Sequence, residues 1–210
     1  MSDLSAEELR ALVQGSDEWL QAKVGYASAS EFSSILAKGG GVTRQKYLRR
    51  IVAERLTGKP TETFTNAHTE RGIEQEPYAR MALEAKQGYA IEECGIIRHP
   101  KYMVSISPDG LIDLDGGAEI KSVIPTVQIE TILADNYPPE HKAQIQGSLW
   151  ISGRQWWDFC SYSPDMPEHL RVYVFRVVRD EAYIATLAAE VTAFLGDVND
   201  LYDKLMEKAK

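Results

Sequence analysis

The pattern of apolar and polar positions divides the chain into a helical first part, a strand-rich middle and a long closing helix. Through most of residues 1–88, apolar side chains recur every three or four positions, which predicts amphipathic helices. From 89 to 178 the apolar runs are short and separated by Pro, Asp and Gly, which predicts strands and turns. Residues 180–208 return to the helical repeat. Helices around a central mixed β-sheet make an α/β fold, and we expect a single domain spanning residues 1–210.

Capping residues and glycines define the helices of the first part. Ser28 followed by Glu31 has capping-box spacing, and Thr43 and Gly58 have the residue types of a helix start and a helix end. Three glycines after Lys38 predict a mobile loop. The predicted helices span residues 4–14, 16–24, 43–58 and 67–87, the last one kinked near Gly72 and Pro77.

The middle part is expected to hold short strands and one helix. Predicted strands span residues 91–97, 103–106, 111–114, 118–123, 156–162 and 171–178. Between the fourth and fifth of these, Pro138 and Pro139 fall in the first turn of a predicted helix that carries Gln144 on one side.

The composition is that of an ordinary globular protein. Hydrophobic residues make up 44% of the 210 residues and charged residues 26%. No run approaches the ~18 consecutive apolar residues of a membrane span, and the acidic N-terminus lacks the basic and apolar regions of a secretory signal. Cys94 and Cys160 are too few for a disulfide framework or a four-thiolate cluster. We therefore expect a cytoplasmic protein without a membrane partner.

The net charge of −8 argues against nucleic acid binding, because phosphate contacts depend largely on Lys and Arg. One stretch departs from this average, since the only acid between residues 38 and 59 is Glu54. The cations of this stretch are Lys38, Arg44, Lys46, Arg49, Arg50, Arg55 and Lys59. An acidic protein can hold DNA in a locally basic channel, but the same stretch also fits a solvated helix face. Charge alone leaves both interpretations open.

Candidate chemistry lies in Ser107-Pro108-Asp109-Gly110 and in Glu119-Ile120-Lys121. Residues two apart in a strand share a face, so Glu119 and Lys121 project together. The Asp-Gly-Gly turn between the two motifs folds one strand back on the next, which brings Asp109 beside Glu119. Two carboxylates and a backbone carbonyl form an oxygen-rich site suited to Mg²⁺. A lysine beside such an ion positions water for hydrolysis of a phosphodiester.

Each motif alone is more often structural, because Pro-Asp-Gly is a common turn and Glu-x-Lys a common exposed strand pair. Their combination across one predicted hairpin favours a metal-dependent nuclease site.

At these residues the sequence resembles the PD-(D/E)XK nuclease superfamily and, within it, the phage lambda-type alkaline exonucleases, the YqaJ-like viral recombinases. The resemblance spans roughly residues 19–173, and the order and spacing of five separate pieces make it specific. It implies the PD-(D/E)XK (restriction-endonuclease-like) fold. The matching pieces are Trp19 to Gly25 with Ser28-Ala29-Ser30-Glu31, Gly72 to Glu76, Ser107-Pro108-Asp109-Gly110-Leu111, Glu119-Ile120-Lys121, and Ala143-Gln144-Ile145-Gln146 with Ser148 and Trp150.

The resemblance implies the metal ligands and the catalytic residues. It makes Asp109, Glu119 and the backbone carbonyl of Ile120 ligands of Mg²⁺, with two ions expected and Mn²⁺ as a substitute. Glu76 would be a further carboxylate on the second ion or its waters, although by itself it is an exposed helical acid. Lys121 would activate or position the attacking water.

The same resemblance places Ser30, Ser107, Gln144 and Lys23 in a pocket for the terminal 5′-phosphate of DNA. Hydroxyl, amide and ammonium groups all donate to phosphate oxygens. Considered alone, Ser30 equally fits a helix cap and Gln144 a surface amide. The family has an arginine where this chain has Lys23, and a lysine binds phosphate as a point charge, without the bidentate geometry of arginine.

The resemblance therefore implies a 5′→3′ exonuclease on linear double-stranded DNA that releases mononucleotides and leaves a 3′ single strand. It also implies a homotrimeric ring around DNA, a single-strand annealing protein as partner in phage homologous recombination, and a phage or prophage gene expressed in a bacterial host.

Three alternatives stay open. One is another PD-(D/E)XK enzyme, such as an endonuclease, a resolvase or a Cas4-like protein; two cysteines count against an iron–sulfur version, which needs four ligands. Another is a non-catalytic DNA-binding module, against which the presence of all three core residues argues. The third is a non-nuclease α/β domain in which the motifs are accidental.

Overall fold

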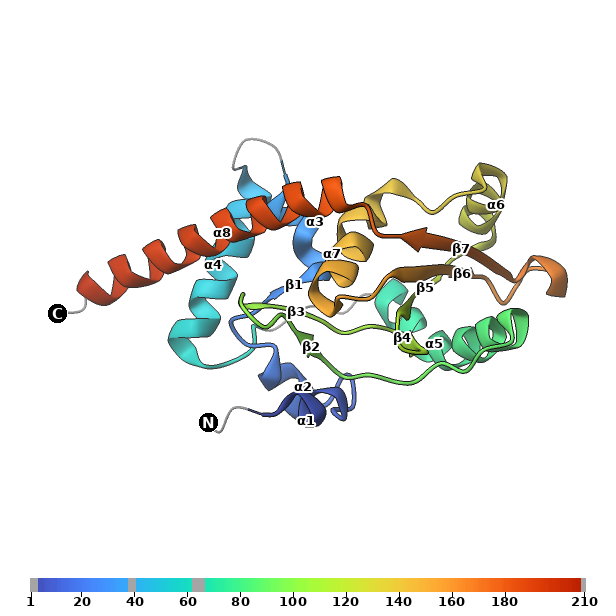
Figure 1. The fold of residues 1–210 in the computed structure, drawn as a ribbon, viewed down its shortest axis with the longest axis horizontal. Coiled ribbons are helices and arrows are strands. Elements are labelled where there is room, and N and C mark those ends of the chain that lie inside the picture. The colour runs from blue at the N-terminus through green and yellow to red at the C-terminus, as the bar shows by residue number, and fades with distance from the viewer. Residues whose placement is uncertain (1–3, 38–40, 62–66, 209–210) are drawn as a thin grey trace.

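The computed structural model describes residues 4–37, 41–61 and 67–208, and in these residues the strands form two adjoining sheets between helices (Figure 1). One sheet has three strands in the order β1-β3-β2, and the other has four in the order β4-β5-β6-β7. Both are mixed, because β1 runs parallel to β3 and β5 parallel to β6, while the other pairs are antiparallel. The predicted α/β fold with a mixed sheet is confirmed, with the sheet divided in two. The strands are β1 (Ala27–Ser28), β2 (Ile97–Arg98), β3 (Val104–Ile106), β4 (Gly110–Ile112), β5 (Gly116–Ser122), β6 (Trp156–Tyr162) and β7 (Val172–Val178).

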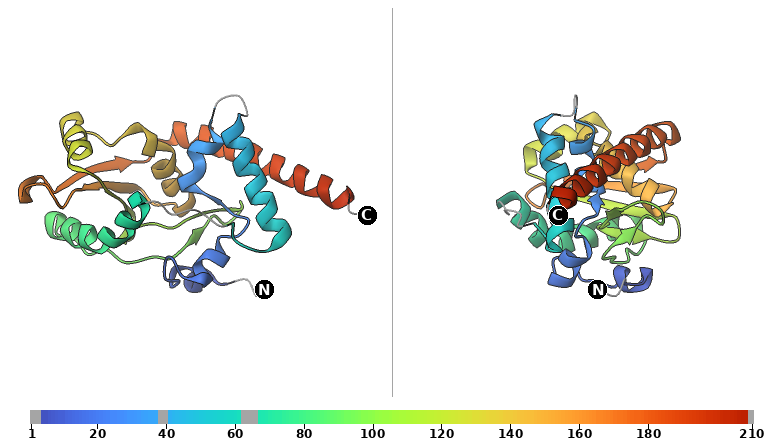
Figure 2. Two further views of the ribbon diagram at one scale, coloured as in Figure 1. Left: turned by 180° about the vertical axis from the view of Figure 1, so that it is seen from behind. Right: turned by 90° about the vertical axis from the view of Figure 1, so that its left-hand side faces the viewer.

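Helices cover both sides of the larger sheet (Figure 2). One helix, α5, packs against β5 and β7, while α7 packs against β6 and α8, and α4 packs against α8. None of the helices in the described part of the chain is long and apolar enough to cross a membrane. The helices are α1 (Ala6–Arg10), α2 (Asp17–Ala22), α3 (Phe32–Ile35), α4 (Val42–Thr57), α5 (Ala67–Gln87), α6 (Pro125–Ala134), α7 (Lys142–Ser152) and α8 (Glu181–Lys208), with 3₁₀ helices η1 (Ala29–Glu31), η3 (Pro139–His141) and η4 (Glu168–Leu170).

Two hydrophobic cores lie on opposite sides of the larger sheet. The larger core joins α3, α4, α7 and α8 to the sheet and includes the fully buried rings of Phe32, Trp157 and Phe194. The smaller core lies under α5 and includes Leu83 and Ile120. Because side chains alternate along β5, burial of Ile120 in the smaller core turns its two neighbours in the strand toward the other face.

The segment Ser107-Pro108-Asp109 joins the two sheets, since it links the end of β3 to the start of β4. The hairpin of β4 and β5 pairs Gly110 with Ala118, so Asp109 lies next to Glu119. A Cβ on Gly117 would lie 2.5 Å from the Trp157 ring, so a glycine is needed where β5 passes this side chain. The hairpin register therefore brings the two carboxylates together, as predicted.

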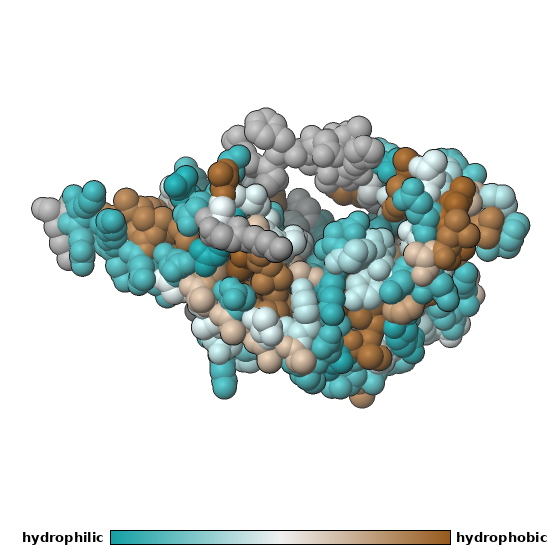
Figure 3. Space-filling view, turned by 90° about the horizontal axis from the view of Figure 1, so that it is seen from above, coloured by the Kyte–Doolittle hydropathy of each residue, from teal (hydrophilic) through white to brown (hydrophobic). Residues whose placement is uncertain are grey.

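The C-terminal part of α8 extends beyond the rest of the molecule (Figure 1). Figure 3 shows apolar side chains on this projecting end, and Leu205 and Met206 are 40% and 45% exposed.

Two predicted helix starts differ in the structure. Ser28 is the N-cap residue of the short helix η1, but its side chain forms no capping bond: its N–H donates to the Tyr47 hydroxyl at 2.8 Å, and its own hydroxyl bonds that of Ser30. Helix α4 is capped by Gly41 and already includes Thr43, while its predicted end at Gly58, in the left-handed region, is confirmed. The predicted mobile loop falls largely on residues 38–40, which lie outside the described residues.

Other elements differ in length. The first predicted helix ends at Arg10, and the predicted strand over 91–97 is reduced to β2 and one bridge between Glu92 and Leu111. Pro138 and Pro139 precede or begin η3, so α7 starts only at Lys142. Helix α5 runs through Gly72 and Pro77 without a break, and α6 was not predicted.

Candidate active site

Asp109, Glu119 and Lys121, which we call the acid–lysine site, lie together on the hairpin of β4 and β5, with Asp109 directly before β4 and the other two on β5. The Ile120 N–H donates to Asp109 Oδ2 at 2.6 Å, and Lys121 Nζ donates to Glu119 Oε1 at 2.6 Å. The Glu119 side chain is only 4% exposed, so the carboxylate of this ion pair is shielded from water, while the Lys121 side chain is 32% exposed. Both bonds follow from the hairpin register and from the alternation of β5.

Burial and neighbouring charges shift the pKa values of Asp109 and Lys121. Burial raises the pKa of Asp109 well above its ordinary value, and the nearby charge of Glu119 raises it further. Burial alone would lower the pKa of Lys121, but Glu119 and Asp109 outweigh burial, so this pKa is raised. In this arrangement Lys121 is a cation and a hydrogen-bond donor at neutral pH.

The donor set fits a divalent cation with hard oxygen ligands. A cation between Asp109 and Glu119 would offset the repulsion that disfavours ionisation of Asp109. Within residues 4–37, 41–61 and 67–208, no three His, Cys, Asp or Glu side chains converge as a metal cluster. The set is therefore two carboxylates with the adjacent carbonyl of Ile120, a composition suited to Mg²⁺ and unlike the His and Cys sets of structural Zn²⁺.

Glu76, the further predicted carboxylate, lies on α5 and faces the same region. It lines a cavity of about 460 Å³ together with Asp109, and its charge contributes to the raised pKa of Asp109 after burial and Glu119. Glu76 Oε1 accepts a hydrogen bond from Arg80 at 2.7 Å, and Arg80 also pairs with Glu93. To bind a second ion, Glu76 must therefore break its ion pair with Arg80, or its carboxylate must bind Arg80 and the ion at the same time.

The four side chains assigned to phosphate, Lys23, Ser30, Ser107 and Gln144, line one small cavity of about 160 Å³, which we call the polar cavity. They come from four segments: the C-terminal end of α2, η1, the link between the sheets, and α7. A Cβ on Gly147 would lie 2.6 Å from the Phe32 ring, so this glycine allows α7 to pack directly against η1 and α3. Close packing at Gly147 thus brings distant polar residues together.

Gln144 also contacts the acid–lysine site. Its Nε2 donates to Glu119 Oε1 at 2.6 Å, the same oxygen that accepts from Lys121. Because Gln144 lines the polar cavity as well, one side chain connects the two sites. No spacing in the sequence predicts this bond.

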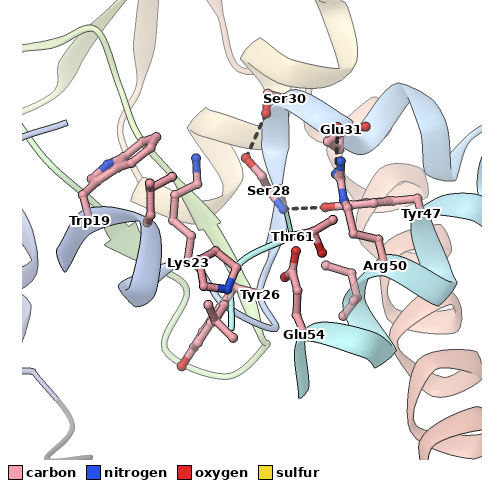
Figure 4. A pocket seen from close by; sticks show the side chains of 14 residues that line it. Trp19, Lys23, Tyr26, Ser28, Ser30, Glu31, Tyr47, Arg50, Glu54 and Thr61 are labelled. Carbon is pink, nitrogen blue, oxygen red and sulfur yellow. Dashed lines mark hydrogen bonds and ion pairs between the residues drawn. The ribbon is translucent and has the colours of Figure 1, made fainter. Parts of the chain in front are cut away.

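Lys23 stands between the polar cavity and a second cavity of about 210 Å³, which Figure 4 shows. Its Nζ lies 3.9 Å from the centroid of the Trp19 ring, and Arg50 and Glu54 line the opposite wall. Burial lowers the pKa of Lys23 to about 8, and the charge of Arg50 contributes to the lowering.

The sequence pattern of the YqaJ-like viral recombinase domain matches residues 18–155. The chain belongs to this family. No curated protein matches this chain. The predicted family is therefore confirmed, and the acid–lysine site and the polar cavity both lie within the matched residues.

Solved structures of similar proteins include alkaline exonuclease LHK-Exo from Laribacter hongkongensis, at 35% identity and a TM-score of 0.86, covering 92% of this chain and 98% of that chain. The same exonuclease in complex with dAMP is 36% identical, with the same coverage and TM-score. A phage-related exonuclease from Haemophilus somnus 129PT shares the fold at 14% identity, with a TM-score of 0.64 and coverage of 88% and 96%. These likenesses bear out the expected nuclease fold of this YqaJ-like chain.

Two residues to which the sequence analysis gave no role, Gln14 and Trp19, hold the segment before Asp109 in this YqaJ-like chain. Gln14 Nε2 donates to the carbonyls of Cys94 and Pro108 at 2.8 Å each. Trp19 Nε1 donates to Ser107 Oγ at 3.1 Å. Trp19 belongs to a matching piece, but in the sequence Gln14 is only a polar residue before a glycine.

Several cations of the basic stretch bind their own chain. Arg44 pairs with Asp197 of α8, and Arg50 pairs with Glu31. Arg55 donates to the Gly25 carbonyl and to Asn199. The stretch is therefore partly structural, while Lys46 and Arg49 are exposed.

Proposed function

We propose that this chain is a Mg²⁺-dependent 5′→3′ exonuclease that acts on linear double-stranded DNA, releases mononucleotides and leaves a 3′ single strand. One observation carries this proposal: the polar cavity adjoins the acid–lysine site, because Gln144 lines the cavity and donates a hydrogen bond to Glu119. The solved relative LHK-Exo, an alkaline exonuclease, supports the same reaction class.

The residues of the acid–lysine site have different catalytic roles in this proposal. Asp109, Glu119 and the Ile120 carbonyl would hold Mg²⁺, with Glu76 as the additional carboxylate if a second ion binds. A bound Mg²⁺ supplies Lewis-acid stabilisation of charge on the phosphodiester. Lys121, held as a cation by Glu119, donates to the scissile phosphate or to the attacking water and so orients them.

The polar cavity gives the reaction its direction. The ammonium of Lys23, the hydroxyls of Ser30 and Ser107 and the amide of Gln144 are donors to a terminal 5′-phosphate. Each cleavage leaves a new 5′-phosphate on the remaining strand, which is the group that this cavity binds. Repeated capture of that phosphate favours stepwise digestion from one end.

We further propose that the 210 residues are one nuclease domain that assembles as a homotrimeric ring around DNA. Exposed apolar residues on the projecting end of α8, Leu205 and Met206, are available for contacts between copies. In phage recombination the 3′ strand would pass to a single-strand annealing protein in the cytoplasm of the bacterial host. A solution mass three times that of the chain supports the ring, and a monomeric mass contradicts it.

Digestion of matched DNA substrates tests the proposed function. With Mg²⁺ or Mn²⁺, linear duplex with 5′-phosphates should be degraded, while circular duplex should remain intact and chelation by EDTA should stop the reaction. Cleavage of circular duplex would favour an endonuclease or a resolvase. Binding of DNA ends without cleavage under any metal would favour a non-catalytic DNA-binding module.

A further inference from the structure

Gln144 occupies the boundary between the polar cavity and the acid–lysine site. It lies in the first turn of α7, lines the polar cavity and donates to Glu119 Oε1 at 2.6 Å. A carboxamide nitrogen carries two hydrogens. One hydrogen is used on Glu119, and the other remains for a ligand in the cavity.

Chemistry fixes the orientation of this amide. An ionised carboxylate only accepts hydrogen bonds, so the NH₂ group of Gln144, rather than its oxygen, must face Glu119. Lys121 and Gln144 both donate to Oε1, and across the described part of the chain no group donates to Oε2. Two short bonds on one oxygen hold the buried carboxylate in place and leave Oε2 for a cation.

We propose that Gln144 is a positioning residue that couples the 5′-phosphate site to the metal site. One N–H fixes the Glu119 carboxylate for the metal, while the other binds the terminal phosphate. This inference rests on the proposed function and adds a linkage to it: phosphate in the polar cavity strengthens metal binding at Glu119, and metal strengthens phosphate binding by the same factor.

The coupling has a consequence for the reaction cycle. A 5′-phosphate in the cavity orders the amide, and an ordered amide keeps Glu119 in its metal-binding orientation. The metal site is therefore most complete when a phosphorylated end is in place. A residue that only contacted phosphate would have no effect on metal binding in the absence of nucleotide, and this difference provides the test.

The first measurement is the affinity of the nucleotide-free protein for Mn²⁺, followed by electron paramagnetic resonance. Gln144→Met keeps the volume of the side chain and removes its donors, so Mn²⁺ affinity should fall about tenfold, the usual scale for loss of a group that orients a metal ligand. Ser30→Ala is the matched control, because Ser30 lines the same cavity but its hydroxyl bonds Ser28. Its Mn²⁺ affinity should equal that of the wild type.

The second measurement is the calorimetric affinity for dAMP and for deoxyadenosine, with Mg²⁺ and with EDTA. Neither compound contains a phosphodiester, so neither is hydrolysed by the proposed reaction. In the wild type, Mg²⁺ should strengthen binding of dAMP more than of deoxyadenosine, and Gln144→Met should reduce this difference several-fold. Direct attraction between phosphate and cation persists in both proteins, so the reduced difference measures the contribution of the Gln144 amide.

Equal Mn²⁺ affinities of wild type and Gln144→Met would overturn the coupling, as would an equally large loss in Ser30→Ala. Either result leaves the proposed exonuclease intact if the wild type still digests linear duplex. Failure of the wild type to digest linear duplex would instead contradict the proposed function itself.

Discussion

The acid–lysine site lies on one hairpin, whereas the polar cavity collects its side chains from four separate segments. In the first, strand register and alternation place Lys121 in contact with Glu119, and Asp109 in contact with the Ile120 N–H between them. In the second, Gln144 and Ser30 meet because α7 packs against η1 at Gly147. Under the proposed function, cleavage would therefore depend on a single hairpin, and recognition of the DNA end would depend on packing between helices. The two regions should therefore respond differently to substitution.

The largest effect is expected at the two carboxylates of the acid–lysine site. Asp109→Asn or Glu119→Gln should lower metal-dependent digestion of linear duplex roughly a thousand-fold or more, because a bound metal contributes several kcal/mol to catalysis. Far-UV circular dichroism should show an intact fold. Glu168→Gln, at an exposed residue of η4, is the charge-matched control and should keep full activity. Activity of either variant within tenfold of the wild type would remove these carboxylates from the reaction.

Substitution of Lys121 should separate chemistry from binding. Lys121→Met removes the donor that we propose orients the reacting groups, so single-turnover cleavage should slow by roughly 100- to 1000-fold. Fluorescence anisotropy in EDTA should show unchanged affinity for 5′-phosphorylated ends, since the polar cavity is intact. Weakened end binding with unchanged cleavage would make Lys121 a phosphate anchor.

Changes in the polar cavity should alter preference more than turnover. Trp19 donates to Ser107 Oγ, so the hydroxyl hydrogen of Ser107 is available to a phosphate. Ser107→Ala should reduce the ratio of kcat/KM for 5′-phosphate over 5′-hydroxyl duplex by about ten- to a hundred-fold, because a hydrogen bond to a charged group contributes about 1.5–3 kcal/mol. Ser33→Ala, at an exposed serine of α3, is the control. An unchanged ratio in Ser107→Ala would exclude this hydroxyl from end recognition.

The smallest expected effect is a pH dependence of the same preference. Burial lowers the pKa of Lys23 to about 8, so in the free protein this side chain is charged below pH 8 and loses its proton above it. The 5′-phosphate preference should therefore decrease several-fold between about pH 7 and pH 9.5, since a single charge-assisted contact is weakened. Taking the ratio of the two substrates at each pH cancels the pH dependence of the chemical step.

Lys23→Arg serves as the control for this pH dependence, because arginine keeps its charge over the whole range. The variant should show a preference independent of pH. A wild-type preference that is constant or rises above pH 8 would contradict a role of the Lys23 charge in end recognition.

The difference between the two regions also explains what the sequence can predict. The contact of Glu119 with Lys121 follows from strand alternation, and the position of Asp109 follows from a short hairpin. No local pattern places Ser30 beside Gln144, so only the family resemblance predicts that they lie close together. Their proximity depends on packing between helices that are separated by more than a hundred residues in the sequence.

The missed helix α6 has a similar physical reason. Its apolar residues Ile129 and Leu133 are 46% and 80% exposed, while its polar Gln128 is fully buried. Gln128 donates to the Leu170 carbonyl and accepts from the Ser161 hydroxyl, so burial follows hydrogen bonding rather than hydrophobicity. A search for an apolar helical face therefore fails at this segment.

The length of the first product released from a linear duplex labelled at its 5′-phosphate tests most directly whether the two regions act on one strand. Gln144 reaches both the polar cavity and Glu119, so the bound terminal phosphate and the scissile phosphate must be neighbours along the strand. With Mg²⁺, the label should appear first in a mononucleotide, at the earliest times and at every enzyme concentration. Label released first in oligonucleotides would contradict the account, because the end would then be held too far from the carboxylates that cut.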